Sequence, residues 1–239
     1  MSVKKEKKRL ETLQNNFSSK DGFNSRLIDF RYQLLSKYFK GKTCLELGSA
    51  DGEGTRHLIT FFNNVTAVDA SPKYIKDIKK NFPSDKVTPI CSLFEELDLQ
   101  EKFDTVMLTH ILEHVEDPVN ILKIAKKFLK KSGVLIADVP NANSINRLVG
   151  VKMGLLKNKF ELHAGDIRIG HRRVYTLETL AKDIKKTGLR VTKQGGVFFK
   201  PVSNDQIEKN WTEEMIQGFL SLGYDFPELC SDIYVVCKQ

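Results

Sequence analysis

Residues 43–54 read TCLELGSADGEG, a short apolar run that leads directly into a turn of small residues. The run predicts a β-strand, and the helical spacing that begins at Glu53 predicts a helix directly after the turn. In doubly wound α/β sheets a glycine-rich turn at the carboxyl end of the first strand is where a ligand binds. A tight strand-to-helix turn without any ligand is the alternative interpretation of this segment alone.

The rest of the chain repeats this alternation of strand and helix. Short apolar runs predict strands, and runs with apolar residues every three or four positions predict helices. The predicted strands are 43–47, 65–69, 87–91, 103–109, 134–139, 189–193 and 233–237, and the predicted helices are 25–39, 53–62, 72–81, 119–129, 176–187 and a helical stretch around 205–222. This order favours an α/β, Rossmann-like, doubly wound and mostly parallel sheet with helices on both faces.

We expect a single domain at 41–239, preceded by a basic tail and a helix at 1–40. Between the fifth predicted strand and the helix at 176–187 the chain runs about thirty residues without a clear helix, far beyond the usual connection of roughly 2 to 6 residues. The insertion, at about 141–173, is interpreted as a substrate lid.

Composition indicates an ordinary folded protein. The chain has 239 residues, of which 41% are hydrophobic and 28% charged, so a core can form without disulfides. The cysteines, Cys44, Cys91, Cys230 and Cys237, lack CxxC spacing and predict buried thiols of a reducing compartment. No window approaches the roughly 20 apolar residues that cross a bilayer, and the start lacks the apolar part of a signal peptide. We expect no membrane insertion and a cytoplasmic location.

The net charge of +8 is unevenly distributed. Half of it lies in the first ten residues, where Lys4, Lys5, Lys7, Lys8 and Arg9 stand against Glu6. A second group of lysines at 123–131 has the spacing of the solvated face of an amphipathic helix. A small-molecule partner is therefore favoured, nucleic acid remains an alternative, and the oligomeric state is left open.

An acidic residue narrows the choice of ligand. Asp69 ends the second predicted strand, where a carboxylate can accept hydrogen bonds from both ribose hydroxyls of an adenosine group. The dinucleotide fingerprint GxGxxG is incomplete, because Ala50 and Glu53 stand at its second and third glycine positions, which disfavours a nicotinamide oxidoreductase. Glu46 and Asp51 would repel a diphosphate but suit a ligand with ammonium and sulfonium charges.

These residues resemble the class I S-adenosylmethionine-dependent methyltransferases. The resemblance rests on 45–52, on 68–71, and on 103–118, which looks like the ubiquinone-biosynthesis type. It implies a seven-stranded sheet with an antiparallel last strand, S-adenosylmethionine as cofactor, and a cofactor site made of Glu46, Gly48, Ala50, Gly52, Asp69, Ala70, Ser92, Leu93, Phe94 and Thr109.

The substrate is less sharply indicated. Segments 133–141 and 170–176 look like those of methyltransferases from bacterial surface-glycan and quinone pathways. We expect O-methylation of a small hydroxylated metabolite such as a sugar or an activated glycan precursor, in polysaccharide biosynthesis. An RNA 2′-O-methyltransferase, a quinone-pathway O-methyltransferase and a non-catalytic adenosine-binding protein are the alternatives.

The histidines are the candidate catalytic groups. His110, Glu113 and His114 would share one face if their segment were helical, and His171 ends the insertion. With His110 in place of a first Glu, they resemble the ExxEH-plus-His metal set of small-RNA and ubiquinone-pathway methyltransferases. The resemblance implies zinc, manganese or iron on His110, Glu113, His114 and His171. The alternatives are a metal-free general base among His110, His114 and His171, or a structural role.

Two weaker groups are interpreted as structural. His163 and Asp166 are expected to cap a loop, with contact to substrate as the alternative. The aromatic residues Phe198, Phe199, Trp211 and Tyr224 are expected in the core, although they could instead form a wall against the acceptor.

Overall fold

The computed structural model of this protein describes residue 9 and residues 22–239, so Lys4, Lys5, Lys7 and Lys8 of the predicted basic tail lie outside the described residues. A seven-stranded sheet forms the centre, in the order β3-β2-β1-β4-β5-β7-β6. Its strands are β1 (Thr43–Leu47), β2 (Asn64–Asp69), β3 (Val87–Cys91), β4 (Phe103–Thr109), β5 (Leu129–Pro140), β6 (Arg190–Val197) and β7 (Asp232–Lys238).

The direction of the strands confirms the predicted fold class. The pairs β1–β2, β2–β3, β1–β4 and β4–β5 are parallel. The last strand, β7, inserts between β5 and β6 and is antiparallel to both. Strand β5 begins five residues before the predicted 134–139, because Leu129 already pairs with Phe103 across a register shift.

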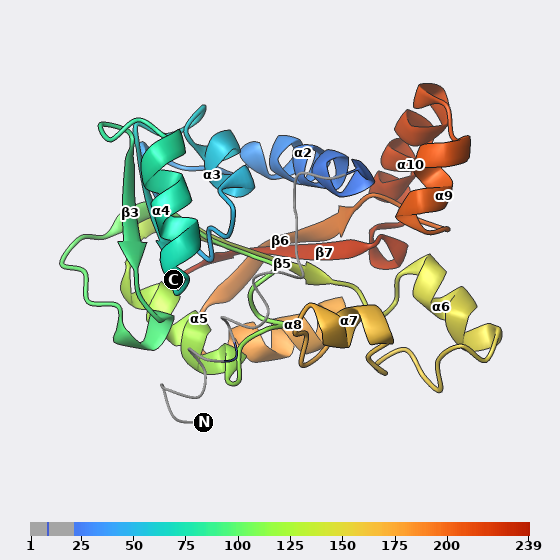
Figure 1. The fold of residues 1–239 in the computed structure, drawn as a ribbon. Helices are drawn as coiled ribbons and strands as arrows, with labels where there is room; N and C mark the ends of the chain where they lie inside the picture. Colours follow the sequence, from blue (N-terminus) through green and yellow to red (C-terminus); the bar gives the residue numbers. More distant parts are fainter. Residues whose placement is uncertain (1–8, 10–21) are drawn as a thin grey trace.

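Helices cover both faces of the sheet (Figure 1). One face carries α2 (Gly22–Ser36), α3 (Glu53–Leu58) and α4 (Pro72–Asn81), together with α9 (Asn204–Asn210) and α10 (Glu213–Asp225) beside α2. The other face carries α5 (Pro118–Lys127) and α8 (Leu177–Lys185). Two hydrophobic clusters match these layers: Ile121 and Ile184 belong to one, and Phe30 and Ile207 to the other.

The single helical stretch predicted around 205–222 is wrong, because the structure has two helices there. Trp211 adopts an extended conformation after α9, and the Thr212 side chain accepts a hydrogen bond from the Met215 backbone to start α10. Trp211 stacks on Phe219, with ring centroids 4.4 Å apart. Of the predicted core aromatics, Phe198 is buried, whereas Tyr224 is 59% exposed.

The insertion also contains helices that the sequence pattern did not predict, α6 (Ile145–Lys152) and α7 (Ala164–Arg168). Both are too short to show a sustained apolar period. His163 and Asp166 cap α7 reciprocally, each side chain accepting a hydrogen bond from the other residue's backbone. The capping role predicted for this pair is therefore confirmed.

The cysteine prediction is wrong at one position. Cys44, Cys230 and Cys237 are buried free thiols, but Cys91 is exposed. Cys91 ends β3, which stands at the edge of the sheet, so it has a neighbouring strand on one side only. Within the described part of the chain, no helix has the length and apolar character needed to cross a bilayer.

Candidate active site

A cavity of about 780 Å³ opens where β1, β2, β4 and β5 end. Helix α2 contributes Asn24 and Arg31 to its wall, and the insertion contributes Arg147 and His171. In a parallel sheet the carboxyl ends of neighbouring strands lie side by side, so groups far apart in the sequence converge here. Of the residues expected at the cofactor, Glu46, Gly48, Ala50, Asp69, Ala70, Leu93, Phe94 and Thr109 line this cavity.

The turn after β1 needs small residues. Gly48 has φ 88°, and a Cβ atom there would lie 1.9 Å from Ile111 Cδ1, so a side chain has no room. Ala50 also has a positive φ, of 42°, and its backbone N–H donates to Asp69 Oδ2 over 3.0 Å. The glycine-rich turn is thereby tied to the end of β2, and its backbone faces the cavity.

Asp69 is held in place by backbone donors. Its Oδ1 accepts from the Ser71 N–H at 2.8 Å, and its Oδ2 accepts from Ala50. Burial raises the pKa of the Asp69 carboxyl, and these backbone hydrogen bonds oppose the rise. Each carboxylate oxygen keeps further acceptor capacity for a ligand that brings hydroxyl donors.

Two residues expected at the cofactor lie behind the wall. Gly52, with φ 85°, precedes α3, and a Cβ atom on it would meet the Phe82 ring at 2.7 Å, so this glycine lets the turn pack against the residue that follows α4. The Ser92 hydroxyl donates to the Leu93 carbonyl at 2.8 Å. The next two residues, Leu93 and Phe94, reach the cavity.

Glu46 forms part of the buried wall of the cavity. It is 1% exposed, and Thr55 Oγ1 donates to its Oε2 over 2.6 Å. Burial raises the pKa of Glu46 to about 8, partly offset by the hydrogen bond from Thr55. A positively charged ligand group would favour its ionised form.

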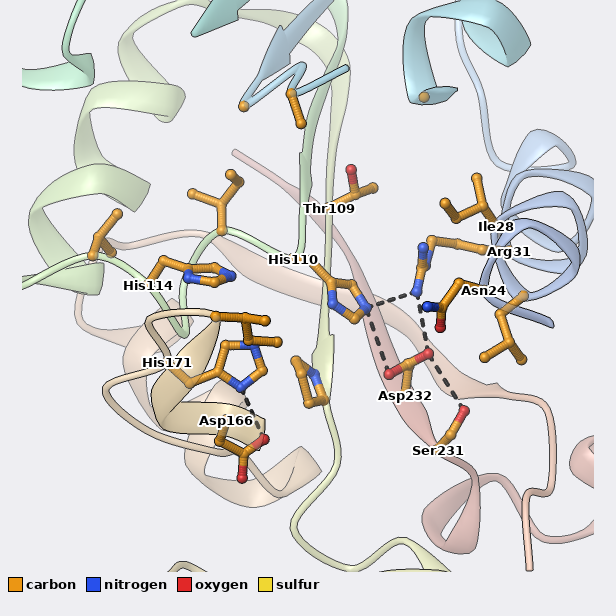
Figure 2. Close-up of a pocket in the computed structure, with 18 of the residues that line it drawn as sticks. Asn24, Ile28, Arg31, Thr109, His110, His114, Asp166, His171, Ser231 and Asp232 are labelled. Carbon is orange, nitrogen blue, oxygen red and sulfur yellow. Dashed lines mark hydrogen bonds and ion pairs between the residues drawn. The ribbon is translucent and has the colours of Figure 1, made fainter. Parts of the chain in front are cut away.

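His110 and His114 would share one face only if their segment were helical. The segment after β4 is not a helix. His110 has φ 53°, and turns follow it. The left-handed conformation sends the two histidines in different directions (Figure 2). His110 Nε2 lies 2.6 Å from Arg31 Nη2, while its Nδ1 lies 3.2 Å from Glu113 Oε1.

Arg31 is the hub of a buried charge network. Its Nε pairs with Asp138 on β5, and its Nη2 lies 3.1 Å from Asp232 Oδ2 at the start of β7. Asp138 is fully buried and Arg31 is 6% exposed. The sequence analysis missed all three residues. The signal in the sequence was Arg31 itself, an arginine within the apolar helical pattern of 25–39. The sequence pattern did not identify the two acids that pair with it.

His114 and His171 form a second cluster with Glu113. Their rings meet edge to face with centroids 4.7 Å apart, and one ligand atom from each of the three residues lies within 4.8 Å of the others. Burial and the neighbouring histidines lower the pKa of His114 to about 3, so its ring is neutral. Both Glu113 carboxylate oxygens are buried without a hydrogen bond. His110 is outside this group of three.

Hydrogen bonds from the insertion hold this cluster. Arg147 Nη2 donates to Asp166 Oδ2 at 2.6 Å, and the other oxygen, Oδ1, lies 3.2 Å from His171 Nδ1. The Arg172 backbone N–H donates to the Glu113 carbonyl at 2.8 Å, and Arg173 Nη1 donates to the Leu112 carbonyl at 2.7 Å. The insertion is thus fastened directly to the turn that carries the candidate catalytic groups.

Comparison with known proteins gives a consistent family match. A family profile described as a methyltransferase domain matches residues 21–194. The mitochondrial ubiquinone biosynthesis O-methyltransferase of Schizosaccharomyces pombe is 30% identical over 137 residues, which cover 54% of this chain and 50% of that protein. The chain spans about half the length of the curated relatives that head this comparison.

Solved structures share the fold at low identity. The N-methyltransferase NodS of Bradyrhizobium japonicum, in complex with S-adenosyl-L-homocysteine, is 15% identical with a TM-score of 0.58, and the match covers 92% of this chain and 90% of that one. An S-adenosylmethionine-dependent methyltransferase of Mesorhizobium loti is 15% identical with a TM-score of 0.64, covering 89% of this chain and 100% of that one.

Proposed function

Because the chain belongs to the class I S-adenosylmethionine-dependent methyltransferases, we propose that it transfers the methyl group of S-adenosylmethionine to a hydroxyl group of a small polar acceptor. The observation that carries this proposal is a single cavity with two chemically different walls. One is the acidic glycine-rich wall of β1 and β2, and the other is lined by histidines and paired charges from α2, β4, β7 and the insertion.

The residues of the first wall fit the cofactor. Glu46 and Asp51 suit its ammonium and sulfonium charges, and Asp69 has acceptor capacity for the ribose hydroxyls. The crowded space at Gly48 keeps the backbone bare where the cofactor would pass. Leu93 and Phe94 offer apolar surface for the adenine ring. S-adenosylmethionine supplies the electrophilic methyl group when bound, and these side chains orient it.

The second wall must align the acceptor and remove its proton. Alignment contributes most when the attacking oxygen is held in line with the methyl carbon. His114 and His171 line the cavity, but a pKa lowered to about 3 makes the His114 ring a weak base. His110 presents Nε2 to Arg31, which leaves His171, whose Nδ1 lies 3.2 Å from Asp166 Oδ1, as the preferred candidate for the general base.

A divalent metal is the other version of the same chemistry. Glu113, His114 and His171 are donors of the type that zinc and other transition metals prefer, and the buried Glu113 oxygens, which accept no hydrogen bond from the described residues, fit such a group. A metal held there would lower the pKa of an acceptor hydroxyl. His110 contacts this cluster through its Nδ1, which lies near Glu113. Its Nε2 faces Arg31 and Asp232 instead.

A second acceptor class is a phenol of the quinone type. The name of the yeast relative supports it, as do apolar residues on the cavity wall, among them Ile28, Leu155 and Ile169. The sugar or glycan precursor expected from segments 133–141 and 170–176 is supported by polar residues on the wall of the same cavity, among them Ser144 and Ser231.

Uptake of radiolabelled methyl groups tests the proposal. The full chain is incubated with labelled S-adenosylmethionine and separate panels of sugars, sugar phosphates, hydroxybenzoates, catechols and RNA. We expect label on one small-molecule class and none on RNA. S-adenosylhomocysteine binding without turnover on any acceptor would support a non-catalytic protein, and salt-sensitive methylation of RNA would replace the small-molecule acceptor.

A further inference from the structure

Lys200 is the exception among the cations that line the cavity. Arg31 is paired with Asp138 and Asp232, and Arg147 is paired with Asp166. Among the described residues, no carboxylate lies within 4.0 Å of the Lys200 ammonium. Its one partner there is neutral: Nζ donates to Asn204 Oδ1 over 3.0 Å.

The surroundings of Lys200 are those of an incomplete site. Burial lowers the pKa of the Lys200 ammonium, and the Asp232 carboxylate opposes this from beyond ion-pair distance. An ammonium with two of its three N–H groups unused, in a partly buried place, is costly unless a further acceptor arrives. Because Lys200 lines the cavity, a bound molecule can bring that acceptor.

A chain of amides positions the lysine. Asn204, at the start of α9, receives the Lys200 hydrogen bond and donates through Nδ2 to Asn24 Oδ1 at 2.6 Å. Asn24 uses its Oδ1 to accept the hydrogen bond from Asn204. The Nδ2 group of Asn24 therefore keeps its N–H donors for a ligand. Asn24 lies on α2 on the cavity wall, on the side where Figure 2 shows Arg31 and Ser231 and away from His114 and His171.

The charges of the two walls differ accordingly. The cofactor wall carries Glu46, Asp51 and Asp69, which suit positive charge. On the opposite wall Arg31 forms ion pairs with two carboxylates, whereas the Lys200 ammonium has the neutral Asn204 amide as its hydrogen-bond partner among the described residues. A neutral acceptor would leave this ammonium without an anion at ion-pair distance among the described residues.

We propose that Lys200, together with Asn24, binds an anionic group of the methyl acceptor, a carboxylate or a phosphate, while the acceptor hydroxyl reaches the histidines. This subsite rests on the proposed function and narrows its substrate class. Charge-assisted hydrogen bonds to a carboxylate or phosphate are about twice as strong as neutral ones, so the anion adds affinity and fixes the orientation of the acceptor.

Paired probes that differ mainly in charge test the subsite. The pairs are 4-hydroxybenzoate with 4-hydroxybenzamide, and glucose 1-phosphate with glucose, titrated calorimetrically into the full chain with and without saturating S-adenosylhomocysteine. We expect the anionic member of at least one pair to bind about tenfold more tightly. The pair that shows the preference distinguishes a carboxylate from a phosphate.

Lys200→Gln should bring the ratio of the affinities for the anionic and the neutral probe close to one. Lys200→Arg should retain most of the preference for the anion. Lys209→Gln, which removes an exposed lysine of the neighbouring helix α9, is the matched control and should change nothing. Competition between inorganic phosphate and the anionic probe is measured on the unmodified protein. It therefore tests the subsite even if the Lys200→Gln variant fails to fold.

Equal binding of both members of each pair, or an unchanged ratio in Lys200→Gln, would overturn the subsite. The S-adenosylhomocysteine titration reads the proposed function separately. Cofactor binding without anion preference leaves the methyltransferase proposal standing and removes the subsite. Anion preference without S-adenosylhomocysteine binding would support an anion site at Lys200 and remove the methyltransferase proposal.

Discussion

Replacing Arg31 by Met should destabilise the protein strongly, although Arg31 is a single residue of α2. The change removes the guanidinium that neutralises Asp138 on β5 and Asp232 on β7. Methionine has a similar length and fills the space with apolar atoms. The Asp138 carboxylate, fully buried, would then have lost its main positive partner.

The size of the effect follows from burial. Removing one partner of a buried ion pair costs about 3–5 kcal/mol, because the other charge remains in a medium of low polarity. For a chain of this length each kcal/mol corresponds to about 2–4 °C in melting temperature. We therefore expect the melting temperature of Arg31→Met to fall by roughly 6–20 °C.

The loss should depend on pH in a defined direction. Burial already raises the pKa of Asp138, and Arg31 opposes the rise, so the pKa rises further in Arg31→Met. A carboxyl whose folded pKa exceeds its unfolded value of about 3.9 holds a proton in the folded state that the unfolded chain has released. The penalty is therefore fully present above the raised pKa and diminishes as pH falls towards 4.

Urea unfolding followed by circular dichroism at several pH values measures this. Arg26→Met is the matched control on the same helix, because Arg26 forms an exposed ion pair with Glu213 and exposed ion pairs contribute little to stability. The double variant Arg31→Met/Asp138→Asn should recover much of the loss. If Arg31→Met costs less than about 1 kcal/mol, or if Asp138→Asn brings no recovery, the buried network does not stabilise the fold as argued.

Three further predictions concern the site. Asp69→Asn should weaken S-adenosylhomocysteine binding about 10- to 100-fold in calorimetry, because the ribose loses an ionic acceptor; unchanged affinity would remove Asp69 from the cofactor site. Glu46, with its pKa raised to about 8, holds a proton in the folded state that the unfolded chain loses near pH 4.5, so stability should fall as pH rises between these two values. The dependence of stability on pH should be flatter in Glu46→Gln, and parallel stability curves for the two proteins would contradict this. Glu113→Gln and His171→Ala should abolish methyl transfer while S-adenosylhomocysteine still binds, and full activity in chelator would exclude the metal and retain the general base.

Much of the fold was predictable because its signals are local. The strand and turn at 43–54 depend on apolar alternation and on small residues within a dozen positions, and β1 has the predicted bounds. Asp69 was predictable for the same reason, since it closes a strand whose end must meet the turn after β1. Short helices were missed: α7 is stabilised by a capping box, and Arg147 of α6 contacts the Glu161 carbonyl and Asp166, whereas neither helix has a long apolar period.

The sequence by itself determined the α/β class, the order of the seven strands along the chain, and the acidic glycine-rich wall, because each depends on neighbouring residues. Only the tertiary structure decided how the histidines divide. The left-handed backbone at His110 turns it towards Arg31, which stands 79 positions earlier in the chain. Arg31 in turn meets Asp232, 201 positions later, because β7 inserts beside β5. Such contacts follow from sheet pairing over long separations, for which no local periodicity exists.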